Sequence, residues 1–127
     1  MSAYAIAHLR PIEEPGEDVF TYIERIQATL DPFGGHFLVH GGQLEELEGS
    51  WPGYVVVIAF PDRAAVRDWY ESAAYQEILP LRTRHIEGEA IIADGVAPGY
   101  DPAHLAAGMR AAAKAAAGAE DSAGAEA

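Results

Sequence analysis

Apolar positions in the first 95 residues follow two different periods. Apolar runs and alternation predict strands at residues 4–9, 36–40, 54–60 and 86–93. Apolar side chains three and four positions apart predict helices at residues 19–30, 62–70 and 73–79. Glu17 and Asp18 precede the first helix, where the helix dipole favours negative charge. The predicted order is therefore β-α-β-β-α-β, with a short extra helix after the second one.

Proline, glycine and capping residues mark the ends of these elements. Asp31-Pro32 is predicted to end the first helix, and Gly34-Gly35 and Gly41-Gly42 bracket the second strand. Ser72 is a predicted N-cap for the short helix, and Pro80 is predicted to end or bend it. The turns are thus predicted from local signals alone.

The order of elements predicts a ferredoxin-like α+β fold with an antiparallel sheet in the order 4-1-3-2. Right-handed crossovers place both helices on one face of this sheet. The other face would expose Tyr4, Ile6, Leu38 and several apolar side chains of residues 54–60. A second copy packed face to face would cover them and enclose a cavity between two sheets. We therefore expect a homodimer.

Charge and composition exclude several partner classes. Twenty acidic and eight basic residues give a net charge of −12, which repels nucleic acid phosphates and anionic lipid headgroups. No apolar run approaches the ~18 residues of a membrane span, and the first residues lack the pattern of a secretory signal. The chain has no cysteine, which excludes disulfides and a cysteine nucleophile. We expect a cytoplasmic protein with no nucleic acid or membrane partner.

The last part of the chain differs in composition. Fourteen of residues 96–127 are alanine, and every Phe and Trp lies before residue 70. Asp101-Pro102 is typical of a helix start, and alanine favours helix as far as about Ala117. Residues 120–127 are predicted to be disordered. We therefore assign one domain to residues 1–96 and an Ala-rich tail, partly helical and then disordered, to residues 97–127.

Five motifs in order resemble one protein family. They are GGHFLVHGG at residues 34–42, LEGSW at 47–51, VVIAFP at 56–61, WYESAAYQ at 69–76 and LR at 81–82. Over residues 3–96 the chain resembles the family called domain of unknown function 1330. The resemblance implies a dimeric α/β barrel, an architecture shared with antibiotic-biosynthesis-type monooxygenases and stress-responsive barrel proteins. It implies no particular reaction.

The sequence departs from this family in the second strand and in the tail. His36 and His40 stand where the family usually carries arginine or lysine. A site built around permanent cations would thereby become titratable near neutral pH, which puts in doubt an anion-binding role carried over from the family. The tail beyond residue 96 has no counterpart in the family pattern.

Histidines are the main candidates for catalytic chemistry. Alternation places His36, Leu38 and His40 on one face of their strand, and we expect His8 to point toward the cavity between the sheets. Spacings of about 9–13 Å between these histidines are too wide for one metal ion, whose bonds are ~2.0–2.1 Å, so no metal site is predicted. His8 and His40 are the candidate catalytic histidines, and hydrogen-bonded or solvated structural histidines are the alternative.

Arg82 is the candidate for orienting an anionic substrate, because a guanidinium holds a carboxylate through two hydrogen bonds. A surface ion pair with one of the acids is the alternative. The candidate substrate-binding residues are His36, Leu38, Trp51, Ile58 and Tyr75. Of these, Trp51 lies in a loop that would either cover the cavity or plug the sheet edge. Tyr75 is a helical aromatic residue that otherwise belongs to the core.

The sequence leaves three functions open. The first is a cofactor-free small-molecule enzyme, monooxygenase-like or isomerase-like, that uses a histidine as acid or base in the dimer cavity. The second is a binding module that returns a small-molecule ligand unchanged. The third is a structural dimer whose cavity is filled by Leu38, Ile58 and aromatic side chains. The residue pattern does not decide whether the chain is an enzyme, and it names no substrate.

Overall fold

The computed structural model describes residues 1–126, with side chains described as far as residue 119. Contacts divide the chain into the unit Met1–Val96 and a second unit that begins at Ala97. The first unit contains β1 (Ala3–Pro11), α1 (Glu17–Leu30), the 3-10 helix η1 (Asp31–Phe33), β2 (His36–His40), β3 (Tyr54–Phe60), α2 (Arg63–Glu71), α3 (Ala73–Thr83) and β4 (Ile86–Asp94). The second contains α4 (Pro102–Glu126).

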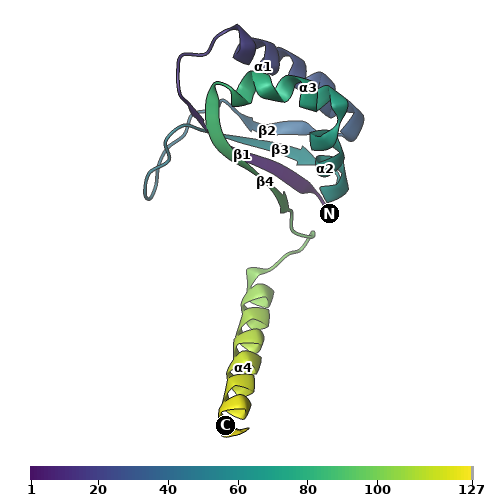
Figure 1. Ribbon diagram of the computed structural model, residues 1–127. Coiled ribbons are helices and arrows are strands. Elements are labelled where there is room, and N and C mark those ends of the chain that lie inside the picture. The colour runs from purple at the N-terminus through teal and green to yellow at the C-terminus, as the bar shows by residue number, and fades with distance from the viewer. Residues whose placement is uncertain (127) are drawn as a thin grey trace. The chain divides into compact units, whose positions relative to one another are not determined.

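The four strands form one antiparallel sheet in the order β2-β3-β1-β4. Read from the other edge, this is the predicted order 4-1-3-2, so the ferredoxin-like α+β fold is confirmed. Helices α1, α2 and α3 cover one face of the sheet, and no helix of the unit Met1–Val96 covers the other face (Figure 1). We call the uncovered side the open face.

The hydrophobic core lies between the sheet and the three helices. Its largest fully buried side chains are Leu30, Phe60, Val66, Tyr75 and Ile78. Apolar residues at helical spacing bring one side of each helix onto the sheet, as the sequence pattern predicts. Side-chain caps fix where two helices begin, because Asp62 accepts from a backbone N–H of α2 and Ser72 from one of α3.

Pro80 does not end α3. The helix continues to Thr83, and the N–H of Arg84 donates to the Pro80 carbonyl at 3.2 Å. Proline has no backbone N–H to donate, but its own carbonyl still accepts a hydrogen bond from the next turn of the helix. The extra turn carries Leu81 and Arg82, and it places Arg82 on the helix rather than in the following loop.

The second unit contains the helix α4. This helix ends at Glu126, whereas the sequence predicted an end near Ala117. High alanine content explains the extension, because alanine has the most favourable helix propensity. Residues 120–126, which were predicted to be disordered, belong to this helix in the structure. Residue 127 lies outside the described residues. Among the described residues, no helix is long and apolar enough to cross a membrane. A cytoplasmic location stays a prediction.

One extra residue in β2 changes the face on which its histidines lie. The pairing of β2 with β3 shifts by one position around Leu38. His36, before the shift, lies opposite Ala59, and His40, after it, lies opposite Val56. Residues 56 and 59 of β3 face opposite sides of the sheet, because side chains alternate along a strand. The prediction that His36 and His40 share a face is therefore wrong, since a β-bulge interrupts the alternation.

Candidate functional site

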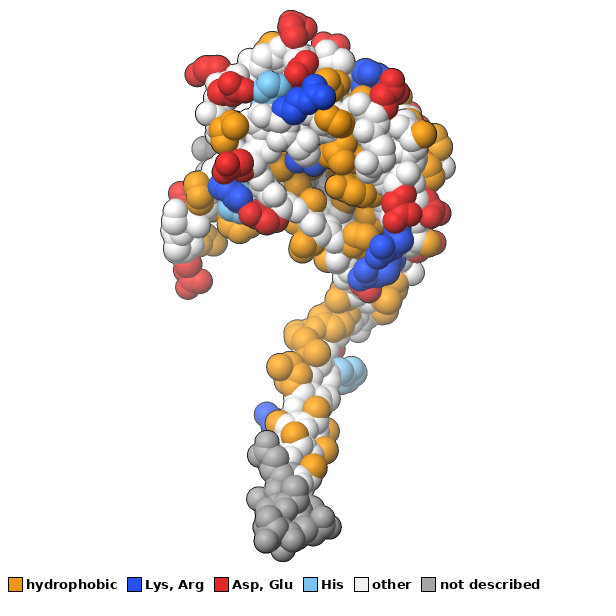
Figure 2. Space-filling model, in the orientation of Figure 1, with side chains coloured by type: hydrophobic (Ala, Val, Ile, Leu, Met, Phe, Trp, Pro, Cys, Tyr) orange, Lys and Arg blue, Asp and Glu red, His pale blue; other side chains and the backbone are white. Residues whose placement is uncertain are grey.

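A cavity of about 970 Å³ lies between the helices and the sheet of the unit Met1–Val96. The sheet side includes small side chains such as Ala7 and Ala90, which are paired on β1 and β4. The helix side is aromatic, with Tyr22, Trp69 and Tyr75. Figure 2 shows a recess with apolar side chains around it. The candidate site thus lies on the helix-covered face of one chain, whereas the sequence predicted it between two sheets.

A cluster of three polar residues lies in this largely apolar cavity. The hydroxyls of Tyr22 on α1 and Tyr75 on α3 lie 2.7 Å apart. The guanidinium carbon of Arg82 lies 5.6 Å from the centre of the Tyr22 ring. All three residues line the cavity, and both tyrosines are buried. The structure therefore joins the predicted Arg82 and Tyr75 through Tyr22, a residue of the first predicted helix that was not among the candidate site residues.

Burial sets the protonation states of this cluster. Burial raises the pKa of Tyr22 well above its usual value, and Tyr75 raises it further while Arg82 opposes the shift. Burial alone would lower the pKa of Arg82, but the electrostatic interaction with Tyr22 and Tyr75 more than offsets this and raises it. At neutral pH the cluster therefore consists of a protonated Tyr22 phenol beside a positively charged guanidinium.

His40 lines the same cavity from the sheet side. Its ring stacks on that of Phe37, with the ring centres 4.1 Å apart and the planes at 8°. Desolvation lowers the pKa of His40 below its ordinary value, so the neutral imidazole predominates at pH 7. A neutral imidazole accepts a proton, and His40 is therefore the candidate base of the cavity.

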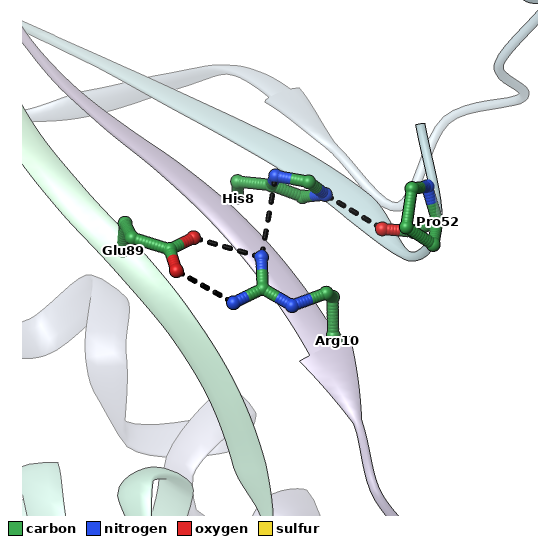
Figure 3. Close-up of polar contacts among 4 residues, drawn as sticks. All are labelled: His8, Arg10, Pro52 and Glu89. Atoms are coloured by element: carbon green, nitrogen blue, oxygen red, sulfur yellow. Dashed lines mark hydrogen bonds and ion pairs between the residues drawn. The ribbon is translucent and has the colours of Figure 1, made fainter. Parts of the chain in front are cut away.

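His8 belongs to a different cluster on the open face (Figure 3). Its Nε2 donates to the Pro52 carbonyl at 2.6 Å, and its ring stacks on Trp51 at 4.2 Å between ring centres. Arg10 donates to Nδ1 of His8 at 3.4 Å and holds Glu89 through two bonds of 2.7 and 2.6 Å. These contacts hold the β2–β3 loop against β1. His8 is a hydrogen-bonded structural histidine here and does not line the cavity.

The structure separates the eight predicted site residues into two groups. Those that line the cavity are His40, Ile58, Tyr75 and Arg82. Those that lie elsewhere are His8, His36, Leu38 and Trp51. The division follows from the sheet, because the helix-covered face holds the cavity and the bulge in β2 leaves only one of its histidines there. Among the described residues, no group of three or more histidine, aspartate or glutamate side chains could hold a metal ion.

His85, at the turn between α3 and β4, is a cavity residue that the sequence analysis missed. Its Nε2 lies 2.9 Å from Asp18, and its Nδ1 contacts Glu13. The backbone adds a bond, since the N–H of Ile12 donates to the His85 carbonyl at 3.2 Å. His85 thus connects the β1–α1 loop, which also lines the cavity, to the turn between α3 and β4. The partners are about 70 residues away in sequence, so no local signal identifies them.

Stability should depend on pH through His85. Hydrogen bonds to Asp18 and then to Glu13 raise its pKa above the ordinary 6.5. The charged form therefore stabilises the folded state fully below pH 6.5, and this contribution is lost as the pH rises through the raised folded pKa. We expect the difference in urea midpoint between the parent and His85→Gln to be larger at pH 6 than at pH 9. An equal difference at both values would assign His85 a packing role only.

The fold and the cavity define a small ferredoxin-like protein with a cavity between its helices and its sheet. The chain belongs to the family Domain of unknown function (DUF1330), which matches residues 2–96. A comparison with the curated proteins finds no match. The family membership predicted from the five motifs is therefore confirmed, and the family's description carries no activity.

Solved structures share the fold at low sequence identity. The RPA0582 protein of unknown function from Rhodopseudomonas palustris is 17% identical, with a TM-score of 0.59 over 76% of this chain and 84% of that one. SnoaB, a cofactor-independent oxygenase from Streptomyces nogalater, is 14% identical, with a TM-score of 0.55 over 79% and 98%. A dimeric ferredoxin-like protein of unknown function from Jannaschia sp. CCS1 is 15% identical, with a TM-score of 0.51 over 75% and 100%.

Proposed function

We propose that the chain is a cofactor-free small-molecule enzyme that moves a proton on an apolar substrate. The observation that carries this proposal is the cavity between the helices and the sheet, which is lined mainly by apolar and aromatic side chains. Two of the polar groups that line this cavity have opposite chemical character. His40 is a neutral base, and Arg82 is a cation. An apolar pocket with few polar groups is typical of a substrate site.

The chemistry follows from these two groups. A ring nitrogen of His40 takes the proton from a C–H group next to a carbonyl, and the C–H electron pair moves to the carbonyl oxygen. The resulting enolate oxygen is stabilised by the positive charge of Arg82. When a C=C bond adjoins that carbon, the product is a dienolate, and return of the proton from His40 to its γ-carbon moves the double bond and completes an isomerisation, so that no atom or electron is gained or lost.

An oxygenation is the second candidate, and similarity to the fold of a cofactor-independent oxygenase supports it. In that reaction the enolate reacts with molecular oxygen, a CH₂ group becomes a carbonyl, and the second oxygen atom leaves as water. Proton removal by His40 is the first step of both reactions. An oxygen electrode separates them, because only the oxygenation consumes oxygen.

Hydrogen–deuterium exchange tests the common first step. The probe is 2-tetralone in deuterated buffer, and nuclear magnetic resonance measures the loss of signal at the carbon between the ring and the carbonyl. We expect the protein to accelerate the exchange, His40→Gln to lower the accelerated rate at least ~100-fold, and Arg82→Gln to lower it by a similar factor.

Matched controls come from the same elements. His36→Gln removes a histidine of β2 that lies on the open face, and Arg84→Gln removes an exposed arginine just after α3. Neither residue lines the cavity, so both variants should keep the rate of the parent. Binding of 2-tetralone without accelerated exchange would contradict the enzyme and favour a binding module. A cavity that binds neither probe nor related ketones would contradict both.

We also propose that the protein is a homodimer joined through the open face. Leu38 and Ile91 on this face are 54% and 58% exposed, and a second copy would remove them from water. Light scattering should give twice the chain mass of 13.6 kDa. Ile91→Asp should shift the mass to that of one chain, whereas Leu105→Asp on α4, where the leucine is 54% exposed, should not. A monomeric parent would contradict the dimer.

A further inference from the structure

The cluster of Tyr22, Tyr75 and Arg82 holds more hydrogen-bond donors than its neighbours can use. Each tyrosine hydroxyl carries one proton, and the 2.7 Å contact between them uses one of the two. A guanidinium has five N–H donors and accepts nothing, so Arg82 cannot take the second proton. Arg82 donates toward both hydroxyl oxygens, and among the described residues no further acceptor contacts either hydroxyl. At least one hydroxyl proton therefore lacks a protein acceptor.

The positive charge in this cluster is also unbalanced. Three other arginines of the unit Met1–Val96 form ion pairs with carboxylates, and these pairs are Arg10 with Glu89, Arg25 with Glu77, and Arg63 with Asp94. Arg67, Arg82 and Arg84 form no ion pair with any described residue, although the chain has twenty acidic residues. Arg67 and Arg84 are exposed to water, whereas Arg82 is half-buried. Its two neighbours are phenols, and the burial of Tyr22 keeps that one protonated. The cluster therefore presents a net positive charge and free donors inside an apolar cavity.

We propose that Tyr22, Tyr75 and Arg82 form a binding site for a single anionic oxygen, such as a phenolate, enolate or carboxylate, carried by an apolar ligand. This inference rests on the function proposed above, because it names the place in that cavity where the substrate oxygen binds. A charged acceptor would take the unused hydroxyl proton and balance the guanidinium at once. The carboxylates that also line the cavity, Glu13, Glu14 and Glu71, are exposed at its rim and do not pair with Arg82.

The ionisation of a bound phenol tests this site directly. The probe is 4-nitrophenol, whose phenolate absorbs visible light and whose neutral form does not. A site that prefers the anion lowers the apparent pKa of the bound probe, and we expect a shift of ~1 unit or more below the free probe. Arg82→Gln should abolish the shift. The double variant Tyr22→Phe with Tyr75→Phe, which leaves no unpaired hydroxyl behind, should reduce it by more than half.

Tyr4→Phe is the matched control, because it removes a tyrosine hydroxyl from the open face of β1 and should leave the shift unchanged. Circular dichroism shows whether the double variant folds, and Tyr22→Phe alone replaces it if it does not. A bound probe with the pKa of the free probe, or a shift that falls by less than half when both hydroxyls are lost, would overturn the inference. Phenolate binding without 2-tetralone exchange would contradict the proposed function and leave this site standing. Exchange of 2-tetralone without a preference for the phenolate would contradict this site and leave the proposed function standing.

Discussion

Ala7→Phe is expected to weaken ligand binding strongly while leaving the fold intact. Ala7 lies on the sheet side of the cavity, so a phenyl ring at this position fills space that a ligand would occupy. Losing ~100 Å² of apolar contact at ~25 cal/mol per Å² costs about 2.5 kcal/mol, which weakens binding ~70-fold. Fluorescence titration with 2-naphthol measures this loss.

The stability of the same variant tests the cavity itself. Adding a large side chain to a packed core typically costs ~1–3 kcal/mol, whereas filling an empty space is neutral or stabilising. We therefore expect Ala7→Phe to unfold at a urea concentration no lower than that of the parent. Ala28→Phe, on the exposed side of α1, adds the same ring outside the cavity and should bind 2-naphthol normally. A destabilised Ala7→Phe would mean that the space above Ala7 is filled.

Trp69→Ala is expected to cause the largest loss of stability. Trp69 is 3% exposed, and its ring lies 4.1 Å from that of Tyr75 and 5.5 Å from that of Phe60, centre to centre. Its indole N–H donates to the hydroxyl of Thr29 at 3.0 Å, and that hydroxyl donates to a carbonyl of α1. Removing a buried aromatic ring costs ~3–5 kcal/mol, a large fraction of the ~5–15 kcal/mol that stabilises a typical domain.

Trp51→Ala provides the comparison, because the other tryptophan is 45% exposed and stacks on His8 in a surface loop. We expect it to cost no more than ~1 kcal/mol. Urea unfolding followed by circular dichroism measures both variants without relying on tryptophan fluorescence. If Trp69→Ala does not fold, Trp69→Phe keeps most of the ring and gives a smaller, measurable loss. Equal effects at the two positions would contradict the assignment of Trp69 to the core.

The fold could be predicted from the sequence because its signals are local. Prolines, glycines and caps mark the ends of elements, and the period of apolar positions distinguishes strands from helices. Connection rules then leave one strand order for β-α-β-β-α-β. Arg82 and Tyr75 were predicted from family motifs, and the structure places both in the cavity. Their partner Tyr22 was missed because a tyrosine at a core position of α1 carries no local sign of a hydroxyl contact with α3.

The rest of the site depends on interactions that no local pattern records. The face on which His40 lies depends on the register of β2 against β3, which the bulge at Leu38 shifts by one residue. The position of the cavity depends on how far the helices stand from Ala7 and Ala90, and that distance is set by packing across the whole unit. His85 meets Asp18 across most of the chain. Each of these features belongs to tertiary structure.

The bulge in β2 means that strand pairing, and not composition, determines which side of the sheet His40 faces. With the bulge, His40 lies opposite Val56 on the helix-covered face. The same five residues paired with β3 without the shift would lie opposite residues 59 to 55, which would turn the imidazole of His40 toward the open face with no amino acid substituted. Deleting the codon of Leu38 would instead leave His36 and His40 opposite their present partners in a regular strand. A gap in this strand of an alignment therefore does not by itself show that the histidine has left the cavity.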